Sequence, residues 1–263
     1  MVNENEQRPL AQTQDNPYQS NRVMKRDFWL IPLFFLVIPL ITALVMFPLR
    51  LIYESQFGDL TRHTFILLNV IGSLVGQIVV VLIYYLMHRK YIIPIAKARF
   101  AKVKRYAWVL LLTYLAMSVA QAIYGGLMLL LPKHLQFDNT QNQMILLQLF
   151  DNPWAWPVLF IDIVILTPII EELIFRHLII HELGKKIGYT AGAILSIIIF
   201  AGIHVTGAVS PFEFGVYAIM AGALVFVYMY SRRNLAVSIA FHMIINGIGF
   251  IGIVGQFIMD KFS

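Results

Sequence analysis

Seven apolar stretches, each near the length of a membrane-spanning helix, constrain the fold of this chain more than any other feature. They lie at about 28–48, 65–87, 107–131, 154–183, 190–207, 212–230 and 234–258. A helix needs roughly 20 residues to cross a bilayer. Hydrophobic residues make up 59% of the 263 residues and charged residues 13%, and a soluble domain of this size could not bury so much apolar surface. We therefore predict an all-α fold, a polytopic transmembrane helix bundle of about seven spans.

Basic residues gather on one side of this predicted bundle. Fifteen of the twenty Lys and Arg residues lie in the N-terminal segment and in the connections after the second, fourth and sixth stretches. Since positively charged loops stay in the cytoplasm, we predict a cytoplasmic N-terminus and an exported C-terminus. The basic run at 89–105 is explained by this topology, so we expect the lipid bilayer as a partner and no nucleic acid.

Ionisable side chains at membrane depth are costly, so each is a candidate for function. Nearly all of them follow residue 160. On a helix, Glu172 and Arg176 are four residues apart, in the favourable order for an ion pair. Glu171 points about 100° away from Glu172 around the helix, which leaves it free for chemistry. The alternative for Glu172 and Arg176 is a structural salt bridge without catalysis.

His204, His242 and Asn246 come from two further stretches. At about 1.5 Å per residue, they and Glu171 lie roughly 12–20 Å from the nearest basic turn. We therefore predict that the four groups share one depth, reached from the cytoplasmic side. Such a set suits hydrolysis by an activated water: a glutamate, alone or with His204, removes a proton from water. His242 and Asn246 would then stabilise the oxyanion.

Other chemistries fit the spacing less well, and we predict no cofactor. A Glu/His/His cluster can bind zinc, but the chain has no H-E-x-x-H motif, and His181–Lys185 ends in lysine where that motif needs histidine. The segment Gly72–Gly76 has its serine one place too early for a G-x-S-x-G nucleophile. Asp162 is the only aspartate in these spans, so an aspartyl pair is excluded there. We interpret His177 and His181 as local polar anchors.

Three motifs in order on successive spans resemble the CPBP family, which comprises CAAX-type prenyl endopeptidases, Abi proteins and bacteriocin-processing membrane proteases. They are Glu-Glu-x-x-x-Arg at 171–176, Phe-x-x-x-His at 200–204 and His-x-x-x-Asn at 242–246. The resemblance covers about residues 150–250 and implies a glutamate-dependent intramembrane endopeptidase, with a cavity open to the cytoplasm and the bilayer. The catalytic residues that it implies, with no metal, are Glu171, Glu172, Arg176, His204, His242 and Asn246.

The resemblance also suggests how the chain is divided and what it acts on. Residues 1–24 are polar and read as a disordered cytoplasmic tail, 25–149 would be variable N-terminal transmembrane helices, and 150–258 the catalytic core. The short loops and the Asn/Gln-rich tail look like those of a bacterial relative in the cell membrane. Its substrate would be a membrane-anchored or amphipathic peptide, in bacteriocin maturation or self-immunity.

Two hypotheses from other classes remain. One is a non-catalytic immunity or scaffold protein whose polar cluster is structural. The other is a proton-coupled transporter, which the missing internal repeat disfavours. Glycines at 247, 249, 252 and 255 allow close helix packing within or between chains, so the oligomeric state stays open.

Overall fold

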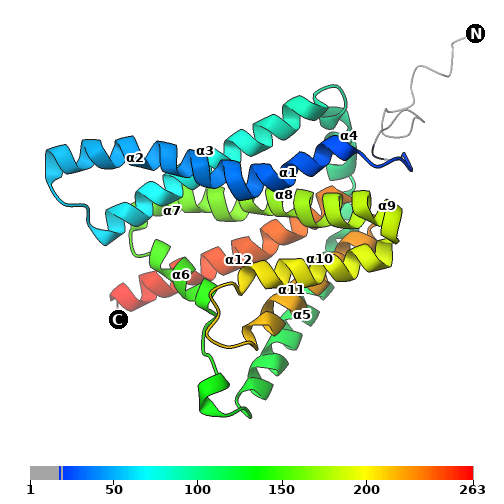
Figure 1. Cartoon of the computed structure of the whole chain (residues 1–263). Coiled ribbons are helices and arrows are strands. Elements are labelled where there is room, and N and C mark those ends of the chain that lie inside the picture. Colours follow the sequence, from blue (N-terminus) through cyan, green and yellow to red (C-terminus); the bar gives the residue numbers. More distant parts are fainter. Residues whose placement is uncertain (1–17, 19, 263) are drawn as a thin grey trace, which may run out of the picture.

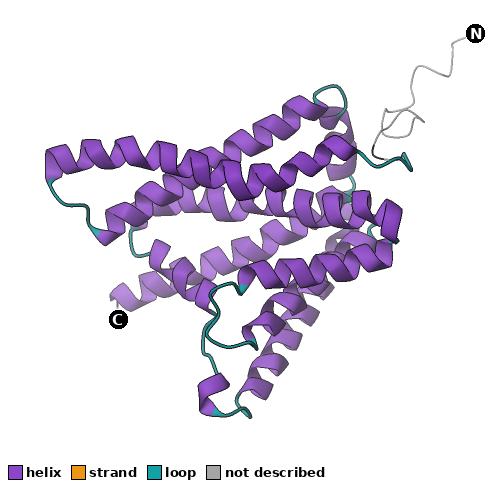
Figure 2. Ribbon diagram, viewed as in Figure 1, coloured by secondary structure: helices purple, strands orange, loops and turns teal. Residues whose placement is uncertain are grey.

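The computed structural model describes Tyr18 and residues 20–262, and every regular element in this part of the chain is helical (Figure 2). The elements of the first half are η4 (Lys25–Trp29), α1 (Leu30–Pro32), η5 (Leu33–Val37), α2 (Ile38–Phe57), α3 (Arg62–His88), α4 (Ile92–Phe100), η6 (Val103–Tyr106), α5 (Ala107–Met128), η7 (Lys133–Leu135) and α6 (Gln141–Leu149). Those of the second half are η8 (Pro153–Ala155), α7 (Trp156–Leu159), η9 (Phe160–Leu166), α8 (Thr167–Glu172), η10 (Leu173–Leu183), α9 (Gly184–Ile187), α10 (Tyr189–His204), α11 (Glu213–Tyr230) and α12 (Leu235–Phe262). The predicted all-α fold is confirmed.

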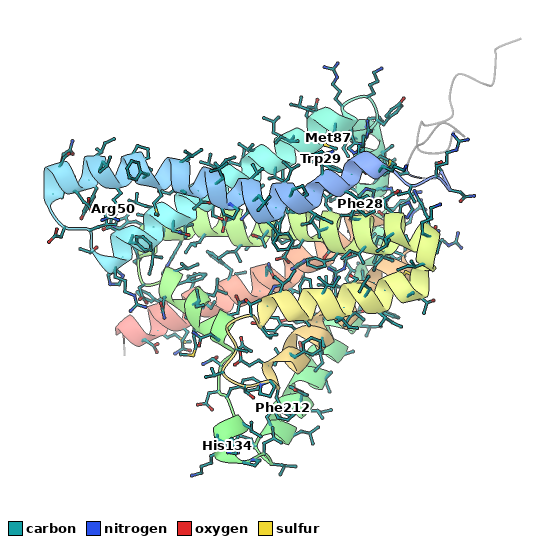
Figure 3. All side chains as sticks on the ribbon, viewed as in Figure 1. Phe28, Trp29, Arg50, Met87, His134 and Phe212 are labelled. Atoms are coloured by element: carbon teal, nitrogen blue, oxygen red, sulfur yellow. The ribbon has the colours of Figure 1, made fainter. Side chains whose placement is uncertain are left out.

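Several helical stretches have the dimensions of membrane spans. Among the described residues, five are long and apolar enough to cross a membrane, and these are Lys25–Phe57, Arg62–His88, Ile92–Met128, Glu213–Tyr230 and Leu235–Asp260. A further apolar helix, Tyr189–His204, is shorter. Large apolar side chains face outward on these stretches; Trp29, for example, is 65% exposed (Figure 3). The chain is therefore an integral membrane protein, and the predicted count of about seven spans is approximate.

The turns divide the bundle into two ends. We call the end that carries the turns at 89–91, 188 and 231–234 the basic end, because the Lys and Arg clusters of the sequence lie at or beside these turns. Gly188 has a φ of 88°, which lets the chain reverse between α9 and α10. We call the other end the opposite end; it holds α6 and the last turns of α12, far from α4 and α9 (Figure 1).

Two glycines bring α2 and α3 into close contact. A Cβ atom at Gly72 would lie 2.8 Å from the carbonyl oxygen of Thr42, and one at Gly76 would lie 3.0 Å from that of Ile38. Small residues four apart let helix backbones approach where lipid gives no hydrophobic drive for association. Ser73, which lies between these glycines, is therefore part of a helix-packing motif.

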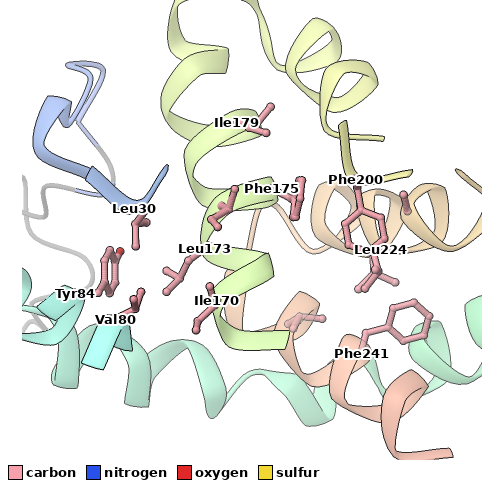
Figure 4. Packing of buried hydrophobic residues seen from close by; sticks show 14 of the residues in the cluster. Leu30, Val80, Tyr84, Ile170, Leu173, Phe175, Ile179, Phe200, Leu224 and Phe241 are labelled. Atoms are coloured by element: carbon pink, nitrogen blue, oxygen red, sulfur yellow. The ribbon is translucent and has the colours of Figure 1, made fainter. Parts of the chain in front are cut away.

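The main apolar core surrounds the helix that carries Glu171. Ile170, Leu173 and Phe175 of α8 and η10 belong to a buried cluster that also includes Phe200 of α10 and Phe241 of α12 (Figure 4). Phe175 and Phe200 pack edge to face, with ring centroids 5.0 Å apart, a favoured aromatic geometry. These contacts fix the rotation of α8 and so decide which acid faces which neighbour.

The N-terminal segment contacts the basic end. Most of the predicted tail, residues 1–17 and 19, lies outside the described residues. The peptide oxygen of Tyr18 accepts a hydrogen bond from Nε2 of His181 at 2.8 Å, and the N–H of Met24 donates to Glu182 at 2.7 Å. Tyr18 and Met24, which lie in the predicted tail, are therefore bound to η10.

His177 is held by a partner far away in sequence. Its Nε2 lies 2.7 Å from Oδ2 of Asp27, and Nε2 of His88 lies 3.0 Å from Oδ1 of the same carboxylate. Asp27 is fully buried, so these two donors satisfy a group that would otherwise be costly in this environment. The interpretation of His177 and His181 as polar anchors agrees with these contacts.

Candidate active site

Glu172 is the inner of the two adjacent acids. Its Oε1 lies 3.1 Å from Nη1 of Arg176 and 3.0 Å from Nδ1 of His242, and Oγ of Ser238 donates to its Oε2 at 2.5 Å. Glu172 and Arg176 are both fully buried. The ion pair expected from the four-residue spacing is present, and it balances two charges that would be very costly alone.

Arg176 is further enclosed by apolar and backbone groups. Its guanidinium carbon lies 5.2 Å from the ring centroid of Phe200, within the range of a cation–π contact. Its Nη2 donates to the carbonyl oxygen of Ala221 at 3.5 Å. Arg176 therefore joins η10 to α10 and α11.

Glu171 faces two imidazole rings. Its Oε1 lies 3.9 Å from Nε2 of His204, and its Oε2 lies 3.6 Å from Nε2 of His242. These separations exceed those of direct hydrogen bonds. The side chain of Glu171 is 11% exposed, whereas that of Glu172 is 0% exposed, so Glu171 is the acid that a small molecule can reach.

The second nitrogen of each imidazole is engaged elsewhere. Nδ1 of His204 lies 2.8 Å from the carbonyl oxygen of Phe200, which can only accept a hydrogen bond. Nδ1 of His242 donates to the ion-paired carboxylate of Glu172. In each neutral ring, therefore, Nε2 carries a lone pair and is directed toward Glu171.

Aromatic stacking fixes the ring of His204. It is stacked between Phe200, with centroids 4.4 Å apart, and Tyr217, with centroids 4.8 Å apart. The hydroxyl of Tyr217 in turn shares a hydrogen bond of 2.7 Å with Thr140. Tyr217 thus orients a predicted site residue, although the sequence analysis did not select it.

Asn246 completes the set from α12. Its Nδ2 donates one hydrogen to the carbonyl oxygen of Ile163 at 2.8 Å, which leaves the second N–H of the amide for another acceptor. Ser238, His242 and Asn246 follow one another at intervals of four residues, so they lie on one face of the helix. This spacing was the signal in the sequence that could have revealed Ser238.

Four of the six predicted residues line one cavity of about 370 Å³, and these are Glu171, His204, His242 and Asn246. Glu172 and Arg176 lie behind its wall and do not line it. The other lining residues include Asn142, Gln143, Leu146 and Phe150 from α6 or just after it, Tyr217 from α11, and Gly249, Phe250 and Ile253 from α12. The structure therefore brings together the groups that the sequence placed at one depth.

The cavity lies toward the opposite end of the bundle, to which α6 and the second half of α12 belong (Figure 1). The expected approach from the cytoplasmic side stays a prediction. Toward the basic end, residues 171–180 are all buried. Sequence spacing gives the depth of a group along a helix. It does not reveal which end of the bundle is closed by side-chain packing.

The Glu and His side chains of the cavity are of the types that bind zinc. No group of three or more His, Asp or Glu side chains in the described part of the chain has an arrangement that could hold a metal ion. The expectation that no cofactor is needed is a prediction that a chelation experiment can test.

A membrane-embedded helical bundle with a buried Glu/His centre defines the class of this protein, and two comparisons show which known proteins it is similar to. Residues 153–248 match the model of the Rce1-like family, described as type II CAAX prenyl endopeptidase Rce1-like. The membrane-embedded CAAX protease MroQ of Staphylococcus aureus (strain USA300) is 30% identical over 165 residues, which cover 60% of this chain and 57% of that protein. These two matches confirm the resemblance to CAAX-type proteases of the CPBP family for this part of the chain.

All six predicted site residues lie within the segment that the family model matches. The chain spans a little over half the length of the relative from Staphylococcus aureus. No solved structure gives a significant match to the chain.

Proposed function

We propose that this protein is an intramembrane endopeptidase that hydrolyses a membrane-anchored or amphipathic peptide with a water molecule activated by Glu171 and His204. The observation that carries the proposal is the arrangement of the two Nε2 atoms around the Glu171 carboxylate, at 3.6 and 3.9 Å, in a cavity of about 370 Å³.

The reaction assigns a role to each group. Glu171, with His204 beside it, takes a proton from water, and the water oxygen attacks the carbonyl carbon of the peptide. The C–N bond then breaks, and the proton passes to the leaving nitrogen. The second N–H of Asn246 and the protonated Nε2 of His242 stabilise the negative charge on the carbonyl oxygen.

Glu172 and Arg176 position this machinery from behind. Because Glu172 accepts from Nδ1 of His242, it holds the ring with Nε2 toward the cavity and stabilises its protonated form. Such partners of a functional histidine fix its tautomer and orientation. Arg176 balances the charge of Glu172. The carboxylate of Glu171 is therefore left to take the proton from water.

The finer parts of the proposal concern location and substrate. We place the protein in a bacterial cell membrane with the N-terminus in the cytoplasm and the C-terminus exported, since most basic residues lie at the basic end. Candidate substrates are membrane-associated peptides processed in bacteriocin maturation or self-immunity. This proposal rests on the family and on the apolar setting of the site.

Cleavage of candidate peptides by the reconstituted protein tests the proposal. Glu171→Gln and His204→Ala should each lower the cleavage rate by about 10²–10⁴-fold, the usual contribution of a general base. Asp59→Asn, in an exposed loop, is the matched control and should cleave like the wild type. If Glu171→Gln and His204→Ala also cleave like the wild type, the assignment is wrong. Glu171→Gln that still protects cells would favour the non-catalytic immunity or scaffold role.

A further inference from the structure

α6 forms one wall of the cavity at Glu171, and it carries two polar side chains that have no partner. Asn142, Gln143 and Leu146 line the cavity from this helix. Asn142 is exposed and Gln143 is half-buried. Within the described part of the chain, neither side-chain amide makes a hydrogen bond; Gln143 uses only its backbone N–H, which donates to Thr140. Since a side-chain amide has two donors and one acceptor oxygen, both groups are available to a polar ligand in the cavity.

A buried glutamate holds the start of α6 in place. Oε1 of Glu213 accepts from the N–H groups of Val209 and Ser210 at 2.8 and 3.1 Å, and its Oε2 accepts from the N–H of Gln141 at 2.7 Å. Glu213 is fully buried. Because a buried carboxylate is costly unless donors satisfy it, these three bonds hold the carboxylate, and the carboxylate in turn fixes the residue before Asn142.

The same face of α11 connects α6 to the catalytic groups. Tyr217 follows Glu213 by four residues, and its hydroxyl shares a hydrogen bond of 2.7 Å with Thr140, which caps α6. The ring of Tyr217 stacks on His204. Hydrogen bonds to an ionised group are roughly twice as strong as neutral ones. The carboxylate of Glu213 is therefore the main tether that places α6 relative to His204, and the hydroxyl contact is the weaker one.

A peptide in this cavity needs partners for its backbone. In a helix the N–H and C=O groups bond to each other, but a peptide that is unwound at the cleaved bond loses these bonds. Unpaired backbone groups are costly in apolar surroundings. The other lining side chains of α6, the residue after it and the far half of α12 are apolar, and they are Leu146, Phe150, Phe250 and Ile253. On this wall, therefore, only the amides of Asn142 and Gln143 can pair with the backbone through their side chains.

We propose that α6 is the peptide-binding wall of the site. The amides of Asn142 and Gln143 hydrogen-bond to the substrate backbone beside the cleaved bond, and Glu213 is the positioning residue that keeps them there. The substrate class is then a peptide that is unwound at the cleaved segment and is recognised through its backbone. This inference rests on the proposed function. Asn142 and Gln143 lie before residues 153–248, the segment that the family model matches, so the wall is a feature of this chain outside that segment.

Substitutions in the protein and in the peptide can be combined to test the backbone contact. The probe is a fluorescent synthetic peptide with an apolar segment, and its affinity is measured with Glu171→Gln protein, which retains the wall. The double substitution Asn142→Ala and Gln143→Ala should weaken binding by about 2–10-fold for each amide lost. Replacing single backbone N–H groups of the probe by ester oxygens should weaken binding to the protein with the amides, and at the contacting position it should have no effect on the protein without them.

The same substitutions in the active protein should raise KM and leave kcat within about threefold of wild type, because the amides bind the peptide and do not take part in proton transfer. Gln148→Ala is the matched control. Its amide lies on the same helix outside the cavity and accepts a hydrogen bond from Arg62, so KM and affinity should stay unchanged.

Glu213→Gln tests the positioning role, since its amide N–H₂ cannot accept a bond from a backbone N–H. It should raise KM and leave kcat within about threefold, and it should add no further loss when Asn142 and Gln143 are already alanine, because Glu213 acts through them. A merely structural glutamate would lower kcat and weaken binding equally in both backgrounds.

The proposal is overturned if the double alanine variant binds the probe like the unchanged wall, if Gln148→Ala weakens binding equally, or if every ester probe loses the same affinity with both proteins. Binding needs no cleavage, so the two failures are distinguishable. Failure to cleave any peptide would contradict the proposed function, whereas cleavage with unchanged KM in the alanine variants would contradict only the role of α6.

Discussion

Nδ1 of His242 lies 3.0 Å from Oε1 of Glu172, so the buried acid of the Glu-Glu pair directly orients the ring that faces the exposed acid. The two glutamates are neighbours in sequence, yet they have separate environments. Glu172 contacts Arg176, Ser238 and His242 inside the core, while Glu171 lines the cavity. This division underlies the first prediction.

Glu172→Gln should slow cleavage by about 10–100-fold, the usual effect of removing the partner that orients a functional histidine. Gln has no negative charge, so the doubly protonated ring that the oxyanion role requires would lose its counter-charge. Ser238→Ala removes only the contact to the other oxygen and should have a smaller effect. Steady-state kinetics measure the rate, and ¹⁵N chemical shifts of His242 show which ring nitrogens carry a proton. If the same nitrogens carry protons in a slow Glu172→Gln variant as in the wild type, this explanation is contradicted.

Tyr217→Phe and Tyr217→Leu separate ring stacking from hydrogen bonding. Phe keeps the stack on His204 and loses the bond to Thr140, so cleavage should stay within about twofold of wild type. Leu loses the stack, worth about 0.5–1.5 kcal/mol, and cleavage should fall by about 2–10-fold. Cleavage rates of the two variants at saturating peptide provide the measurement. Equal loss in both would show that the hydroxyl, rather than the ring, positions His204.

Gly72→Leu should destabilise the protein by forcing α2 away from α3, because its first side-chain atom would already meet the Thr42 backbone at 2.8 Å. Overpacking of this kind costs about 1–3 kcal/mol. Gly125→Leu is the control, since nothing lies within 4 Å of a Cβ there. Thermal unfolding in detergent should show a lower midpoint for Gly72→Leu only. Similar midpoints would mean that the two helices separate without cost.

Chelation tests the prediction that no cofactor is needed. After dialysis against a strong zinc chelator, cleavage should continue at the original rate, because a carboxylate and an imidazole suffice to activate water in the proposed reaction. Loss of activity that zinc restores would show that Glu171, His204 and His242 act as metal ligands. Glu171→Gln should remain inactive with or without added zinc.

Contacts within one helix were predictable from the sequence. The spacing of Glu172 and Arg176 predicted their ion pair, and the structure shows it at 3.1 Å. The common depth of Glu171, His204 and His242 also followed from counting residues along helices. By contrast, the partner of His177 is Asp27, which is 150 residues away, and no local pattern connects the two.

The sequence by itself determined that the chain is a membrane-embedded helical protein and selected the residues of its candidate site. Hydropathy and helix periodicity are local properties, so they can be read along the chain. Only the tertiary structure decided that Glu172 is enclosed, that Glu171 lines the cavity and that the cavity leads toward α6. These features depend on how α8 is rotated against α10, α11 and α12, and that rotation is fixed by packing between Phe175, Phe200 and Phe241, side chains from distant parts of the chain.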